Sequence, residues 1–311
     1  MYQDKVLIVG TGAIGGFYGA LLAKAGANVS VVCRSDYDIV KQQGYTINSS
    51  QLGQWSFMPS QIIRDANEYQ GHADYIILCT KNIPEINRVQ LIINAVSKKT
   101  CLVFIQNGVE VEQELIAAFP EHEIISGLAF ICSQKTKPGI IHHLAYGTLT
   151  LGSLNNSGRP STNAQHLSHL INLAGIESLT TGHIMQSRWL KCLWNASFNP
   201  LSVLSGGLST QAILNSQEPL IRTIMQEVCN IAAACGHPLA DDSIDINIQN
   251  TYSMPPYKTS MLLDFENNRR MEIEAILGNT VRAAQRENIS CPVLDTLYAL
   301  MKLKQLSGLQ H

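Results

Sequence analysis

The sequence predicts an α/β protein in which a doubly wound parallel sheet forms an N-terminal domain and a second, all-helical domain follows. Two observations support this fold class. In the first half of the chain, short β-branched runs alternate with helical patterns, which is typical of parallel strands joined by helices. From about residue 183 onward, apolar residues recur only at helical spacing, so no further strand is expected there.

In the N-terminal domain, a first strand at residues 5–9 leads through a cluster of glycines into a helix at 14–25. Further strands are expected at 28–33, 75–79, 101–105 and 123–126. After Pro138, two runs at 140–145 and 148–151 flank Tyr146-Gly147, which predicts an antiparallel hairpin that extends the sheet. Residues 44–67 show no clear period and are expected to include an irregular connection.

In the C-terminal half, apolar residues form one helical stripe between 221 and 235, before Gly236, and another between 270 and 287, before Asn288. The boundary is therefore placed near residue 182. This predicts an N-terminal domain of residues 1–182 and a helical domain of residues 183–311.

Composition excludes several classes of function. The chain has 311 residues, with 22 Lys and Arg against 24 Asp and Glu, so its net charge is −2. This balance offers no basic surface for nucleic acid or for anionic lipid, and neither is expected as a partner. Charged residues make up only 15%, against roughly 25% in typical soluble domains, and hydrophobic residues reach 45%. The apolar excess indicates much buried surface and is compatible with a homodimer interface.

The eight cysteines favour a reduced, cytoplasmic setting. They show no CxxC spacing and no metal-ligand cluster, and several lie in apolar runs where a free thiol behaves as a small hydrophobe. Residues 6–23 carry no charge and superficially resemble a signal peptide or a membrane span. Their five glycines, and Asp4 in front of them, favour a tight turn and a close-packed helix instead. No metal site is expected.

The glycine cluster predicts a dinucleotide-binding loop of the Rossmann type. Gly10 permits a sharp turn, Gly12 lets backbone N–H groups approach a pyrophosphate, and Gly15 lets the helix pack on the strand. The phosphates would then lie at the positive end of the helix. The pattern is weak alone, but here it follows a strand and precedes a helix. The residues expected at the cofactor are Gly10, Thr11, Gly12, Ala13, Ile14 and Gly15.

The end of the second strand indicates which dinucleotide is bound. An acid there bonds the ribose hydroxyls of NAD, whereas a cation accommodates the 2′-phosphate of NADP. The chain has Arg34 at this point, followed by Ser35, and Arg34 can make a forked contact with phosphate. This favours NADP(H). The alternative is that Arg34 is an ordinary surface residue and that Asp36 serves as the ribose ligand.

Two further strands end in polar residues that would face the same crevice. Thr80-Lys81 follows one strand and Gln106-Asn107-Gly108 follows another, and ligands of open α/β sheets lie outside the carboxyl ends of the strands. Lys81 could hold cofactor or substrate charge, and Asn107 could orient a carbonyl. Taken alone, each is more often an ordinary residue of a strand-to-loop junction, and their shared position at this edge of the sheet is what favours a functional role.

In the helical half, Lys191, Asn195 and Asn199 follow one another at i, i+4 spacing, which places an ammonium and two amides on one helix face before Pro200. A buried polar stripe needs a partner, because burying an ammonium or an amide without hydrogen bonds costs several kcal/mol. A ligand site would supply that partner. The alternative is an exposed helix face.

Further along, Ser260, Asp264, Glu272 and Glu274 surround the start of a predicted helix. Acids in a first helical turn often only complement the helix dipole. His142 and His143 are adjacent in a predicted strand and point to opposite faces, so they do not form one metal site.

Five motifs taken together resemble those of the ketopantoate reductases (2-dehydropantoate 2-reductases), in the same order and over nearly the whole chain. They are GTGAIGG, CTK, QNG, KCLWNASFNP and TSMLLDFENNRRMEIE. The resemblance implies a Rossmann domain followed by a helical domain. It also implies an oxidoreductase that uses NADPH to reduce 2-dehydropantoate (ketopantoate), a branched 2-keto acid with a hydroxymethyl group, to pantoate for pantothenate and coenzyme A biosynthesis.

Carried over residue by residue, the resemblance implies that Lys191 and Glu272 are catalytic. It implies that substrate contacts come from Asn107, Asn195, Asn199 and Ser260, and that Arg34 and Lys81 contact NADPH, with Asn107 also near the cofactor. Asp264 would have a supporting role. The chain departs from the family pattern around Pro84 and through residues 44–67.

The implied reaction is hydride transfer from NADPH to the keto carbon while Lys191 donates a proton to the oxygen. Two alternatives remain open. One is an NADPH-dependent reductase of another 2-keto or 3-keto acid, and the other is a non-catalytic NADPH-binding sensor built on the same fold.

Overall fold

The structure is a computed structural model that describes residues 3–155, 158–254 and 258–308. The chain forms two compact units. The sheet unit comprises Met1–Lys81, Ile86–Gln106 and Glu112–Ile184, and the helical unit comprises Asn82–Glu85, Asn107–Val111 and Met185–His311. Two short segments from the first half of the sequence therefore belong to the helical unit.

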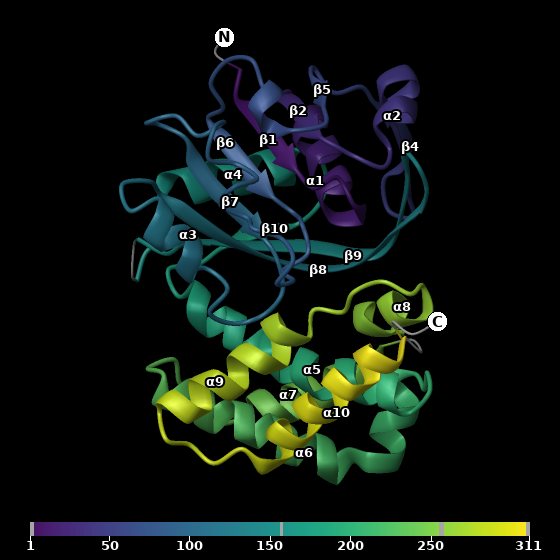
Figure 1. Cartoon of the computed structure of the whole chain (residues 1–311), viewed down its shortest axis with the longest axis vertical. Coiled ribbons are helices and arrows are strands. Elements are labelled where there is room, and N and C mark those ends of the chain that lie inside the picture. Colours follow the sequence, from purple (N-terminus) through teal and green to yellow (C-terminus); the bar gives the residue numbers. More distant parts are fainter. Residues whose placement is uncertain (1–2, 156–157, 255–257, 309–311) are drawn as a thin grey trace. The chain divides into compact units, whose positions relative to one another are not determined.

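The sheet unit contains a mixed, largely parallel sheet in the order β4-β3-β9-β8-β7-β6-β1-β2-β5 (Figure 1). The strands are β1 (Lys5–Val9), β2 (Asn28–Val32), β3 (Tyr45–Ser49), β4 (Gly53–Phe57), β5 (Ile62–Ile63), β6 (Tyr75–Leu78), β7 (Cys101–Ile105), β8 (Ile124–Lys137) and β9 (Ile140–Ser153), and β10 (Ser178–Thr180) pairs with β9. The run β5-β2-β1-β6-β7-β8 is parallel throughout and has the doubly wound order 3-2-1-4-5-6. Its topological switch point lies between β1 and β6.

The helix predicted at 14–25 is confirmed as α1, and other strands of the sheet unit are also followed by helices. The helices of this unit are α1 (Ala13–Lys24), α2 (Tyr37–Gln43), a 3₁₀ turn (Ala66–Glu68), α3 (Gln113–Ala118) and α4 (Thr162–Leu173). Strands β6 and β7 are fully buried along their length, because a parallel sheet is covered on both faces. This double burial is why these strands read as continuous apolar runs in the sequence.

The predicted hairpin around Tyr146-Gly147 is wrong. Residues 140–153 form one strand, β9, which pairs antiparallel with β8, and the turn lies at Pro138-Gly139. Tyr146-Gly147 is a β-bulge: the register shifts there, and both residues have positive φ, 63° and 118°. Positive φ values at two consecutive residues occur in bulges as well as in turns, so the local sequence did not distinguish a bulge from a turn.

Residues 44–67 include an irregular connection at 58–61, as expected, but also three strands that the sequence analysis did not identify, β3, β4 and β5. Strand β3 pairs parallel with β9 and antiparallel with β4. Its pairing with β9, about a hundred residues away, makes β3 an inner strand, and burial alternates along it.

Asp36 connects the end of β2 to the β8–β9 turn. Its buried carboxylate accepts hydrogen bonds from Lys135 Nζ, with both oxygens at 2.8 Å, and from the Gly139 N–H at 3.2 Å. Burial by itself would raise the pKa of Asp36, but these bonds and one from Ser35 lower it below its usual value.

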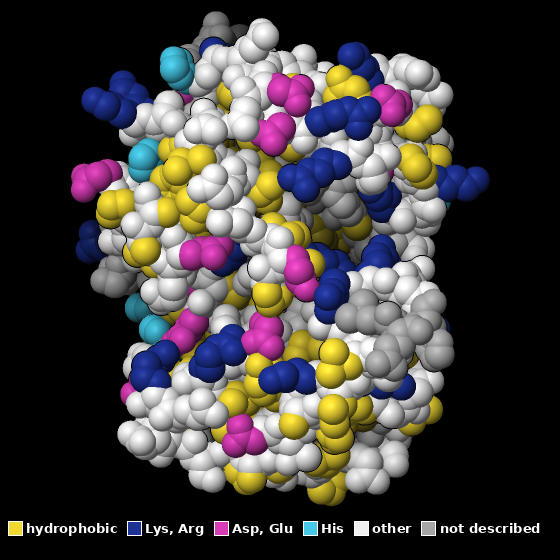
Figure 2. All heavy atoms as spheres, viewed as in Figure 1, with side chains coloured by type: hydrophobic (Ala, Val, Ile, Leu, Met, Phe, Trp, Pro, Cys, Tyr) yellow, Lys and Arg dark blue, Asp and Glu magenta, His cyan; other side chains and the backbone are white. Residues whose placement is uncertain are grey.

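The helical unit is built from α5 (Ile184–Leu204), α6 (Thr210–Ala234), α7 (Ser243–Ser253), α8 (Ser260–Glu266), α9 (Asn279–Arg286) and α10 (Pro292–Gly308), with a π-helical turn at Glu274–Gly278 that leads into α9. Among its described residues, from 185 onward, there is no strand, which confirms the all-helical prediction. Helix α5 continues through Pro200 rather than ending there. Acidic and basic side chains are interspersed on the face of this unit drawn in Figure 2. In the part of the chain that the structure describes, no helix has the length and apolarity needed to cross a membrane.

We predict that Asp36→Asn lowers the free energy of unfolding by about 1–3 kcal/mol at pH 7, because it leaves the Lys135 ammonium without its carboxylate. The folded-state pKa of Asp36 is depressed, so its contribution is present above pH ~4 and is lost as the pH falls below that value. Urea unfolding at pH 7 and pH 3 measures both effects. The exposed Asp38, which pairs with Arg64, provides the control Asp38→Asn, expected to change little. An equal loss at both pH values would contradict the assignment.

Candidate active site

The glycine loop of the sheet unit has the backbone that a phosphate-binding turn requires. Gly10 has φ +94°, and a Cβ there would lie 2.7 Å from Thr80 N, so both the turn and the close approach of β6 demand glycine. A Cβ on Gly15 would collide with the Gly10 carbonyl and lie 2.9 Å from Cys79 Cβ. Gly12 differs, because nothing within 4 Å would meet its Cβ and its φ is −72°. The fold itself does not require glycine at this position, so the space suits an external group.

Helix α1 begins directly after Gly12, without a side-chain cap. The first intrahelical bond runs from Gly16 N to Gly12 O at 3.0 Å, so the preceding N–H groups of Ala13, Ile14 and Gly15 have no partner within the helix. Thr11 is buried, and its hydroxyl donates to Val32 O at 3.5 Å. These residues could hold a pyrophosphate on the helix N-terminus, as the loop pattern predicts.

At the end of β2, Arg34 is exposed, whereas Asp36 is 3% exposed and bound to Lys135. The carboxylate is therefore already engaged inside the sheet unit. Arg34 is an exposed positive charge close to the carboxyl end of this strand.

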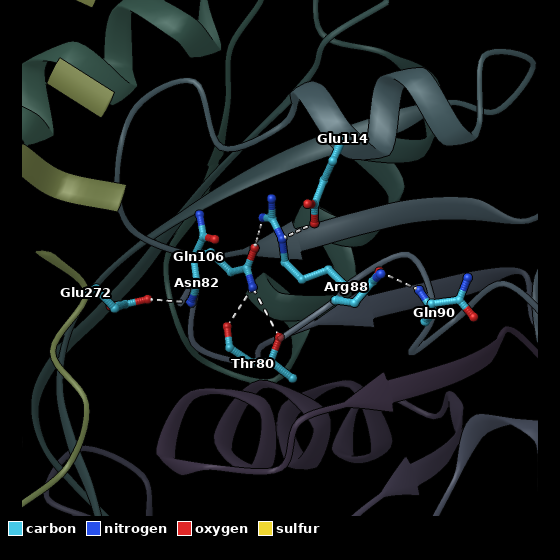
Figure 3. Close-up of polar contacts among 8 residues, drawn as sticks. Thr80, Asn82, Arg88, Gln90, Gln106, Glu114 and Glu272 are labelled. Atoms are coloured by element: carbon cyan, nitrogen blue, oxygen red, sulfur yellow. Dashed lines mark hydrogen bonds and ion pairs between the residues drawn. The ribbon is translucent and has the colours of Figure 1, made fainter. Parts of the chain in front are cut away.

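The carboxyl ends of β6 and β7 are connected by a hydrogen-bond network that includes the side chains of Gln106, Arg88 and Glu114 (Figure 3). Gln106 Nε2 donates to Thr80 O at 2.6 Å, and Gln106 Oε1 accepts from Arg88 Nη1 at 2.7 Å. Arg88 is 4% exposed and also donates to Glu114 at 2.6 Å. Lys81, half-buried, follows Thr80 directly. Sequence reasoning missed Arg88, which has no local signal because its partners lie on other elements.

In the helical unit, Glu272 joins the two segments that follow β6 and β7. Its Oε1 accepts the Asn82 backbone N–H at 2.9 Å, the contact drawn in Figure 3, and its Oε2 accepts from Asn107 Nδ2 at 3.4 Å. Glu272 directly precedes the helix that begins with the π-helical turn, where π-turns frequently mark functional positions. The structure thus brings together Asn107 and Glu272, which are far apart in the sequence.

Lys191 is electrostatically coupled to this carboxylate. The residue lies on α5 and is partly exposed, and its pKa is lowered from 10.5 to about 8. Burial of the ammonium is the largest cause, the positive charge of Arg188 adds to the decrease, and the negative charge of Glu272 opposes it. An ammonium with this pKa can both hold a proton at neutral pH and donate it.

Asn195 and Asn199 lie on the same helix at the predicted spacing, and both are buried, at 8% and 1% exposure. Among the described residues, neither Nδ2 nor Oδ1 of Asn199 has a hydrogen-bond partner. A fully buried amide without partners is costly, so this side chain suits a polar group from outside the chain.

Ser260 is the exposed first residue of α8. Its neighbour Thr259 caps α8 and bonds Ser202 at 2.6 Å, and Ser202 in turn donates to Asn199 O at 2.8 Å. The start of α8 is thus tied to the Asn199 end of α5.

The other acids have structural partners. Glu274 binds Arg282 at 2.8 Å and Tyr298 at 2.7 Å, and Asp264 lies 3.4 Å from Arg269. The described residues contain no group of three or more His, Cys, Asp or Glu arranged to hold a metal ion.

Known proteins resemble this chain over its whole length. Residues 6–156 match the family model described as ketopantoate reductase PanE/ApbA, and residues 183–305 match its C-terminal counterpart. The crystal structure of 2-dehydropantoate 2-reductase from Methylococcus capsulatus is 51% identical, with a TM-score of 0.93 and coverage of 98% of this chain and 97% of that one.

Two further relatives extend the comparison. The 2-dehydropantoate 2-reductase of a Nostoc species is 33% identical over 307 residues, covering 97% of this chain and 95% of that protein. The ternary structure of D-mandelate dehydrogenase with NADH and anilino(oxo)acetate has a TM-score of 0.87 with 98% and 99% coverage, but at 22% identity this likeness concerns the fold alone. The chain belongs to the ketopantoate reductase family of oxidoreductases, which act with a nicotinamide cofactor.

Proposed function

We propose that the protein reduces 2-dehydropantoate (ketopantoate) to pantoate with NADPH, the reaction that serves pantothenate and coenzyme A biosynthesis. The single observation that carries the proposal is the cluster in the helical unit, where Lys191, with a pKa of about 8, is coupled to Glu272 and Glu272 is bonded to Asn107. Two relatives that cover nearly the whole chain bear the name 2-dehydropantoate 2-reductase, which supports this substrate.

When bound, NADPH supplies a hydride to C2 of the keto acid. The carbonyl π electrons move to oxygen as the new C–H bond forms, and Lys191 donates a proton from Nζ to that oxygen, which yields the hydroxyl. Lys191 is left neutral and regains a proton from solvent. With a pKa of about 8, most of the lysine is charged at pH 7, so the acid is ready before each turnover.

Glu272 maintains the charge of Lys191, since its carboxylate raises the pKa of the ammonium. The buried amides of Asn195 and Asn199 and the hydroxyl of Ser260 would bind the polar groups of the substrate, namely its carboxylate and hydroxymethyl group. The partnerless amide of Asn199 fits this role, because a bound keto acid would satisfy it.

The pyrophosphate of the cofactor would be held by the glycine loop, Gly10, Gly12 and Gly15, and by the first turn of α1. The nicotinamide half would be contacted by Lys81 and Asn107. NADP rather than NAD is favoured because Asp36 is buried and bound to Lys135, whereas Arg34 is exposed and can reach a 2′-phosphate.

The deciding experiment follows NADPH oxidation by purified protein with a panel of 2-keto and 3-keto acids that includes ketopantoate, with NADH in parallel. We expect ketopantoate to give the highest kcat/KM. A higher value with another keto acid would identify a different reductase. If the protein binds NADPH but oxidises it with none of these acids, the result would favour a non-catalytic sensor.

Lys191→Ala is expected to lower kcat by at least about 100-fold, the contribution typical of a general acid, while NADPH affinity stays nearly constant. In the wild type, kcat/KM should fall above pH ~8 as Lys191 loses its proton, and in Glu272→Gln the fall should begin at lower pH. Steady-state kinetics across pH 6–10 measure these effects, and Lys304→Ala, on α10, removes another lysine of the helical unit as the control. Near-normal turnover of Lys191→Ala would remove this lysine from the mechanism.

Arg34→Ala is expected to raise the KM for NADPH by about 10-fold, the equivalent of one charge-assisted hydrogen bond, and to leave the KM for NADH unchanged. The exposed Lys98 precedes the opposite end of β7 and provides the matched loss of positive charge in Lys98→Ala, which should alter neither value. Equal effects of Arg34→Ala on both cofactors would refute the phosphate contact.

Gly12→Ala is expected to leave the melting temperature unchanged, because its Cβ meets nothing, and to weaken NADPH binding by about 10-fold or more. Gly15→Ala should instead lower the melting temperature, because its Cβ would collide with the Gly10 carbonyl. Thermal unfolding and fluorescence titration with NADPH separate the two outcomes. Unaltered NADPH affinity in Gly12→Ala would show that the pyrophosphate does not approach this residue.

A further inference from the structure

Arg188 is a buried cation whose position the proposed reaction does not by itself explain. It lies on α5, three residues before Lys191, and is 1% exposed. Its Nη1 donates to the carbonyl oxygen of Gly108 at 2.8 Å. A buried guanidinium is costly to desolvate, and removing it would leave the Gly108 carbonyl without this bond. Such a residue usually persists because other groups depend on it.

The segment that Arg188 binds, Asn107–Val111, carries Asn107 to Glu272. Two further contacts hold it on the side of the π-helical turn and α9: Val109 N donates to Ala275 O at 3.2 Å, and Asn279 Nδ2 donates to Val109 O at 2.7 Å. Gly108 lies so close to Ala275 that a Cβ would meet its backbone. The segment is therefore held between α5, through Arg188, and the turn that follows Glu272.

The positive charge of Arg188 also lowers the pKa of Lys191. Residues three apart on a helix are neighbours on its surface, with about 5–6 Å between their Cβ atoms. The charged groups that shift the pKa of Lys191 are Arg188, on the same helix, and Glu272, from the segment before the π-helical turn, and they act in opposite directions. The nearby Asn107 and Gly108 contribute only neutral groups.

We propose that Arg188 is a positioning residue that fastens the Asn107–Val111 segment to the helix of Lys191 and places a fixed positive charge beside the proton donor. This inference rests on the proposed function for its kinetic consequences. Glu272 and Arg188 then form an opposed pair: the carboxylate favours the charged lysine, and the guanidinium favours release of its proton. Together they set the pH at which the lysine stops donating.

Three variants separate the charge of Arg188 from its hydrogen bond. Arg188→Met removes both, and we expect kcat/KM to fall about 10- to 100-fold, as when supporting contacts of a site are lost, and the alkaline fall in activity to move to higher pH. Arg188→Lys keeps the charge without the forked donor. It should lower kcat/KM while leaving the alkaline fall near its wild-type pH.

Arg286→Gln is the matched control. Arg286 binds Glu110 of the same segment at 2.7 and 2.9 Å, but it is half-exposed, so this variant should change neither kcat/KM nor the pH profile appreciably. If Arg188→Met fails to fold, as judged by circular dichroism, the comparison of Arg188→Lys with Arg286→Gln still decides whether the segment depends on Arg188.

A readout that needs no turnover distinguishes failure of this inference from failure of the proposed function. Amine labelling of the intact protein across pH, with peptide mass spectrometry, gives the pH at which Lys191 becomes nucleophilic in each variant. We expect this pH to rise in Arg188→Met and not in Arg188→Lys. An unchanged value in Arg188→Met, or wild-type kinetics in Arg188→Lys, would overturn the inference. The expected labelling shift without any keto-acid reduction would overturn the proposed function alone.

Discussion

The organisation of the helical unit depends on one carboxylate. Glu272 accepts a backbone N–H from Asn82 and a side-chain amide from Asn107, so a single residue late in the chain binds two segments that follow strands of the parallel sheet. These segments belong to the helical unit, although they lie within the first half of the sequence. The same carboxylate raises the pKa of Lys191. Glu272 therefore both holds the two segments and affects the protonation of the lysine.

The cluster around Lys191 contains several groups that lower the stability of the fold, which a purely structural site would avoid. A cation at 1% exposure, a lysine whose pKa is lowered by burial and an amide without described partners all oppose stability. Proteins tolerate such groups where binding or catalysis uses them. The buried guanidinium of Arg188 and the carboxylate of Glu272 act in opposite directions on the pKa of Lys191.

The sheet unit shows a complementary arrangement at its strand ends, where polar side chains bind one another. Asp36 is bound by Lys135, and Gln106 bonds both Thr80 and Arg88. Gly12 has space above it that the chain does not fill. Family membership agrees with this division, because the two family models match the two halves of the chain separately.

The sequence alone determined the fold class, strand β1 and strand β7 to the residue, and the shared helix of Lys191, Asn195 and Asn199. Each of these depends on short-range periodicity or on full burial of an apolar run, which a local stretch of sequence records. Tertiary structure decided that Tyr146-Gly147 is a bulge, that residues 45–49 are an inner strand, and that Arg188 binds Gly108. Their partners lie between 15 and 94 residues away, and hydrogen bonds over such separations exist only once the chain has folded.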